Sequence, residues 1–98
     1  MKLCPLPNAL MELLPGAIIT RRQEHDWRSA TFSGARLILD LQIEGYDAVR
    51  ASNMAKMIKD HEFSLPDLLV ADIAVTDQRA MEGVTMLTVE ALVLDEET

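Results

Sequence analysis

The chain has few of the residues that build disulfides, thiolate metal sites or stacking surfaces. One cysteine, Cys4, occurs among 98 residues, which excludes an intrachain disulfide and a multi-thiolate metal site. A single thiol fits a reducing compartment, so we expect a cytoplasmic protein. The four aromatic residues are too few to stack a run of bases.

Long hydrophobic runs are also missing. No stretch reaches the roughly 18 uninterrupted apolar residues of a membrane span, so no membrane partner is expected. Residues 3–14 are apolar, but Pro5, Pro7 and Pro15 make them a poor match to an export signal.

Basic residues are scarce in the second part of the chain. Residues 60–98 hold one arginine and ten acids, whereas residues 1–59 hold eight basic and six acidic residues. The net charge of −7 would repel phosphate, and no dense basic cluster offsets it, so nucleic acid is not expected as a partner. An acidic half of this kind suits a protein partner instead.

The composition is that of one globular domain, with 49% hydrophobic and 26% charged residues. Residues 1–98 show no linker or repeat. Leu10, Leu13 and Leu14 recur at helical spacing before Pro15, which predicts a short helix or arm within residues 1–16. The acidic tail at residues 95–98 is expected to be disordered.

Period-2 alternation is strongest in residues 35–43, where leucine or isoleucine occupies positions 37, 39, 41 and 43. Residues 17–22 are expected to form an earlier strand, followed by a polar turn at residues 23–26. Ser33-Gly34 has two interpretations that the sequence leaves open. It is either a tight turn that pairs residues 27–32 with 35–43 or a bulge inside one long strand.

Residues 47–60 switch to helical spacing, with Asp47 as the expected N-cap and a stripe of apolar side chains: Ala48, Ala51, Met54, Ala55 and Ile58. Alternation returns in residues 68–77 and 84–94, which we expect to form an antiparallel hairpin around a loop at residues 76–83. The predicted fold is therefore α+β, a two-layer sandwich. A mainly antiparallel sheet of about four strands would carry one principal amphipathic helix and a short N-terminal helix.

The odd positions of these strands are the expected core face, but the even positions are also partly apolar: Ile38, Val70, Ala74, Met86, Leu92 and Leu94. Monomers rarely leave such a face in water. The sequence allows three ways to cover the even face: the N-terminal helix folds back over it, a second copy of the chain packs on it across a two-fold axis, or another protein binds it.

Two groups of polar residues could bind a ligand. The tetrapeptide of residues 25–28 combines His25 and Trp27 with Arg28, although a polar loop anchored by Trp27 explains it equally. Asp40, Asp72 and Arg36 fall on the even face, where the two carboxylates would approach each other if residues 35–43 and 68–77 were neighbouring strands. Cross-strand ion pairs are the simpler interpretation.

No catalytic residue, metal ligand set or cofactor is predicted, because the chain has no nucleophile elbow, phosphate-binding loop or dinucleotide fingerprint. We therefore expect a non-enzymatic interaction or accessory module that forms a homodimer through its sheet. The alternative is a small ligand-binding protein or enzyme with a pocket between helix and sheet or at the dimer seam.

Overall fold

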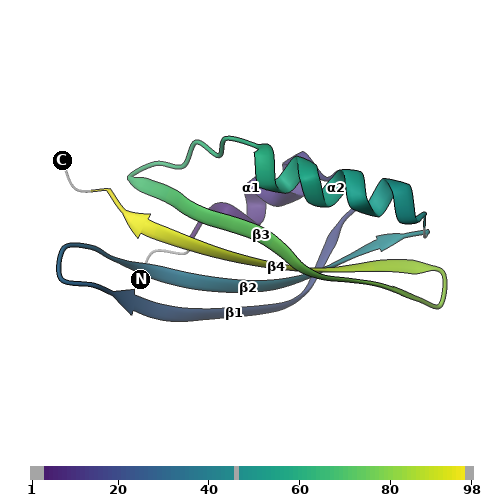
Figure 1. Cartoon of the computed structure of the whole chain (residues 1–98), viewed down its shortest axis with the longest axis horizontal. Helices are drawn as coiled ribbons and strands as arrows, with labels where there is room; N and C mark the ends of the chain where they lie inside the picture. Colours follow the sequence, from purple (N-terminus) through teal and green to yellow (C-terminus); the bar gives the residue numbers. More distant parts are fainter. Residues whose placement is uncertain (1–3, 46, 97–98) are drawn as a thin grey trace.

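The computed structural model describes residues 4–45 and 47–96. Within them two helices and four strands follow in the order α1 (Leu6–Leu13), β1 (Ile18–Arg28), β2 (Ser33–Glu44), α2 (Ala48–Asp60), β3 (Leu68–Met81) and β4 (Val84–Asp95). The strands form one sheet with the order β1-β2-β4-β3, and every neighbouring pair is antiparallel. The predicted α+β fold is confirmed (Figure 1).

Both helices lie on the same side of the sheet (Figure 1). Leu6 and Leu10 of α1 and Ile58 of α2 are fully buried in one cluster. The sheet contributes the odd positions of the two central strands to it: Leu37, Leu39, Leu41 and Ile43 of β2, and Leu87, Val89, Ala91 and Val93 of β4. Helix α1 therefore does not cover the even face, so the sequence alternative of a folded-back helix is wrong for the described residues.

Helix α2 begins where its N-cap was predicted. The Oδ1 atom of Asp47 accepts hydrogen bonds from the backbone N–H groups of Val49 at 2.9 Å and Arg50 at 3.2 Å. These bonds satisfy donors that have no partner within the helix. The predicted stripe is buried at Ala51, Met54 and Ile58 and half-buried at Ala55, but Ala48, in the first turn, is exposed.

Asp47→Ala is expected to lower the free energy of unfolding by about 1 kcal/mol, because it removes both capping hydrogen bonds. Urea denaturation followed by circular dichroism would measure the loss. Glu62→Ala is the matched control, because this exposed carboxylate lies just beyond α2, and its replacement should change stability by less than about 0.5 kcal/mol. Equal stability of the two variants would contradict the capping role.

The first hairpin turns at residues 29–32. Ser29 Oγ accepts a hydrogen bond from the Phe32 N–H at 3.1 Å, and the Ser29 N–H donates to the Phe32 carbonyl at 2.8 Å. Ser33 and Gly34 are instead the first residues of β2, so both sequence interpretations are wrong. The predicted polar turn at residues 23–26 is also wrong, because these residues belong to β1 and pair with β2. Strand β1 is an edge strand, where polar and charged side chains can be exposed to water.

The second hairpin is confirmed, but its loop is shorter than predicted. Strand β3 continues to Met81, and the turn consists of Glu82 and Gly83, both with positive φ (49° and 80°). Two such residues form the tight turn that matches strand twist. The predicted disordered tail is wrong for residues 95–96, since Asp95 ends β4 and the Glu96 N–H donates to the Asp67 carbonyl at 3.0 Å. Residues 97–98 lie outside the described residues.

The register of β3 shifts between Val70 and Asp72 and again between Val75 and Asp77. Because of the first shift, Val70 pairs with the buried Val93 on the helix side, whereas Leu69 pairs with Leu94 on the opposite side. The prediction that Val70 lies on the even face is therefore wrong. One extra residue at position 71 reverses the face of everything before it.

Candidate functional site: the open face of the sheet

We call the side of the sheet opposite the two helices the open face. Residues paired across antiparallel strands share a face, so the register places side chains in rows that run from β1 through β2 and β4 to β3. Four consecutive rows are Trp27-Gly34-Leu94-Leu69, His25-Arg36-Leu92-Asp72, Gln23-Ile38-Glu90-Ala74 and Arg21-Asp40-Thr88-Asp77.

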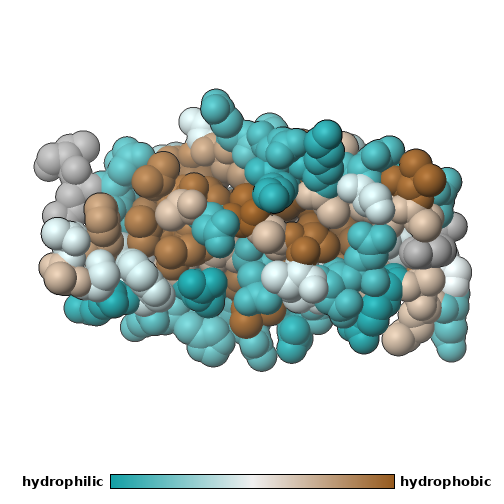
Figure 2. Space-filling view, in the orientation of Figure 1, coloured by the Kyte–Doolittle hydropathy of each residue, from teal (hydrophilic) through white to brown (hydrophobic). Residues whose placement is uncertain are grey.

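One end of the open face is richer in apolar side chains, and we call it the apolar end: its first row is apolar throughout, and the next two rows mix apolar and polar residues. The first three rows contribute the apolar side chains Trp27, Leu69, Leu92, Leu94, Ile38 and Ala74. Leu69 is 48% exposed, whereas Leu94 is only 8% exposed. Figure 2 shows hydrophobic residues gathered where β3 begins and β4 ends. The predicted interface residues Ile38, Met86, Leu92 and Leu94 lie on this face.

The centre of the open face is polar and internally paired. Asp40 Oδ2 accepts from Arg21 Nε at 2.8 Å, and its Oδ1 accepts from Thr88 Oγ1 at 2.8 Å. The Asp40 side chain is only 16% exposed, so the two contacts compensate for the loss of water around its charge. On β3, Asp77 Oδ2 pairs with Arg79 Nε at 3.0 Å. The simpler of the two interpretations from the sequence, a cross-strand ion pair, is therefore correct for Asp40.

Other charges on the open face have no ion-pair partner among the described residues. Arg36 lies on β2, whereas Asp72 and Glu90 lie on β3 and β4. Except for Glu44 at the last position of β2, the unpaired positive charge therefore belongs to the half of the face formed by β1 and β2, and the unpaired negative charges belong to the other half. This separation is not visible in the sequence, since it depends on the strand order.

Five of the six predicted ligand residues share the open face: His25, Trp27, Arg36, Asp40 and Asp72. They lie along rows of the sheet rather than around one point. Asp40 and Asp72 do not form the carboxylate pair considered above, because β4 lies between β2 and β3. His25 and Arg36 are cross-strand neighbours, which places an imidazole beside a guanidinium.

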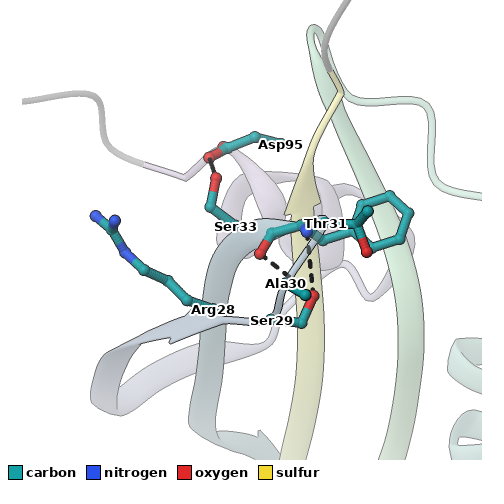
Figure 3. A pocket seen from close by; sticks show the side chains of 7 residues that line it. Arg28, Ser29, Ala30, Thr31, Ser33 and Asp95 are labelled. Atoms are coloured by element: carbon teal, nitrogen blue, oxygen red, sulfur yellow. Dashed lines mark hydrogen bonds between the residues drawn. The ribbon is translucent and has the colours of Figure 1, made fainter.

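Arg28, the sixth residue, lies on the other side of β1, because neighbouring strand residues alternate in direction. It lines a shallow hollow of about 310 Å³ at the first hairpin turn, with residues 29–33 and Asp95. Within the hollow, Ser33 Oγ donates to Asp95 Oδ2 at 3.0 Å, and Arg28 extends away from these two side chains (Figure 3). Sequence reasoning did not find this hollow, because it placed the turn elsewhere.

Cys4 and the potential metal ligands are the remaining groups of chemical interest. Burial raises the pKa of the Cys4 thiol, which packs against the core and is therefore a poor nucleophile at neutral pH. Within the described ranges, no three His, Cys, Asp or Glu side chains are arranged to hold a metal ion. None of the helices described here is long and apolar enough to cross a membrane.

Comparisons with protein-family models, with curated proteins and with solved structures gave no match.

Proposed function

We propose that this chain is a non-enzymatic interaction module that associates with a second copy of itself through the open face. The observation that carries the proposal is the apolar end of this face, which neither helix covers. An antiparallel sheet with one wet face normally alternates apolar and polar residues. Here Trp27, Leu69 and Leu92 lie on the side that the helices leave open.

A second sheet would bury these side chains. In face-to-face packing, the inner side chains of two sheets interdigitate over a separation of about 10 Å. A two-fold axis lets one surface act as its own partner, and such dimers are the commonest soluble oligomers.

The size of the open face also supports a dimer. The sheet has four strands. With strands about 4.8 Å apart and about 11 residues long at about 3.4 Å each, its flat area is about 700 Å². A standard stable interface buries about 800 Å² per partner, so this face alone approaches that size.

The proposal includes a cytoplasmic location, which the single cysteine supports. It includes no enzymatic role, because the predicted ligand residues lie in rows on a sheet and do not converge.

Leu69→Glu is expected to weaken dimerisation at least 100-fold, since it buries a carboxylate in the apolar row of the interface, where no basic side chain lies. Light scattering coupled to size exclusion would measure the molar mass over a concentration series. Ser52→Glu, on the exposed side of α2, adds the same charge away from the sheet and should leave the mass unchanged. A Leu69→Glu protein that stays folded and keeps the wild-type dimer affinity would refute the proposal.

A further inference from the structure

We infer that the two copies pack about a two-fold axis that runs along the strands, between β2 and β4. Strand β1 of one copy then faces β3 of its partner, and β2 faces β4. The inference rests on the proposed dimer and adds its orientation, which the pairing rows and the unpaired charges determine.

Symmetry leaves two principal arrangements. A face-to-face dimer requires its two-fold axis to lie in the interface plane, and aligned sheets keep their strands within about 30° of each other. With an axis along the strands, every row meets the same row of the partner in reversed order. With an axis across the strands, every strand meets its own copy instead.

Charge complementarity favours the axis along the strands. In this arrangement Arg36 lies over the partner's Leu92, between the partner's Glu90 and the partner's Asp72. All three of these charges lack an ion pair within the described part of the chain. An axis across the strands reverses the order of the rows, and when it passes through this row it places Arg36 over its own copy and Asp72 over its own copy, where like charges repel. When it passes through any row other than that of Trp27, it lays the apolar row over a more polar row of the partner.

The apolar rows agree with the same axis. The row that begins at Trp27 meets itself reversed, so Trp27 faces the partner's Leu69, and Leu94 faces the partner's Gly34. Glycine has no side chain there, which leaves room for the leucine. Rotation about an axis parallel to the strands keeps each row at the same height along the strands. The apolar ends of the two copies therefore meet, whichever strands the axis passes between.

In the same row as Arg36, His25 faces the partner's Asp72. The edge strand β1 thus adds a polar partner for the carboxylate on the opposite edge strand. Each copy contributes both halves of this contact, so it occurs twice in the dimer.

A charge exchange between copies tests the orientation. We compare two variants, the single variant Arg36→Glu and a double variant that combines Asp72→Lys with Glu90→Lys. By itself, each is expected to dimerise more than tenfold more weakly than the wild type, because like charges then face each other. An equimolar mixture should form a heterodimer with nearly wild-type affinity, since both contacts become attractive again. Sedimentation velocity gives the dissociation constants, and native mass spectrometry identifies the heterodimer.

The outcomes separate the two claims. Recovery in the mixture also proves that both variants are folded. If the wild type dimerises but Arg36→Glu and the double variant dimerise as well as it does, the orientation is wrong and the proposed interaction module stands. If the wild type is monomeric throughout, the proposed function fails and the orientation fails with it.

Discussion

Gly34→Ala is expected to lower the free energy of unfolding by about 3 kcal/mol or more. A Cβ atom at position 34 would overlap the backbone carbonyl oxygen of Val93 and lie 2.9 Å from the Leu94 Cα. Backbone atoms of a central strand cannot move aside as a flexible side chain can. The two central strands, β2 and β4, would have to separate at this point, which disrupts their pairing at the end where β2 begins.

Chemical denaturation of both proteins would measure this effect. Thr31→Ala is a suitable control, because Thr31 is an exposed residue of the adjacent turn, and its replacement should cost less than about 0.5 kcal/mol. A loss below about 1 kcal/mol for Gly34→Ala would mean that β4 does not approach β2 as closely as described.

Leu10→Ala is expected to cost about 3 kcal/mol, because the leucine is fully buried between α1 and the sheet and its removal leaves a cavity. Met11→Ala is the matched control. Met11 is the next residue of α1 but is 39% exposed, so its truncation should cost less than about 1 kcal/mol.

Thermal or urea denaturation would compare the two variants. The difference in stability between the two variants tests whether α1 packs on the same side of the sheet as α2. If it does, α1 leaves the open face uncovered. Equal losses for Leu10→Ala and Met11→Ala would contradict that placement.

The central strands could be predicted from the sequence because buried and less buried residues alternate regularly along them. Leu37, Leu39 and Leu41 alternate with less buried residues since one side of β2 packs on the helices. Helix α2 could be predicted for a similar reason, because its N-cap and its apolar stripe are both local features.

The edge strands could not be predicted as well, because exposure removes the pattern. Residues 23–26 of β1 are polar on both sides, which resembles a turn. The bulge at residue 71 of β3 carries no local signal, yet it moves Val70 to the helix side and Leu69 to the open face. Such reversals follow from pairing with β4, and pairing is a property of the tertiary structure.

The sequence predicted that a second, partly apolar face exists, but it did not predict how the charges are arranged on that face. The even positions of β2 and β4 indicated a second partly apolar surface, and Ile38 and Leu92 do lie on it. The opposed charges of Arg36 and Asp72 became visible only with the strand order, because these residues sit on strands that are not neighbours.

Sedimentation equilibrium of the wild-type chain tests most directly whether the open face is buried against a second copy. At concentrations of about ten micromolar and above, we expect a mass twice the 10.9 kDa of one chain. A mass of 10.9 kDa across the whole concentration range would contradict it.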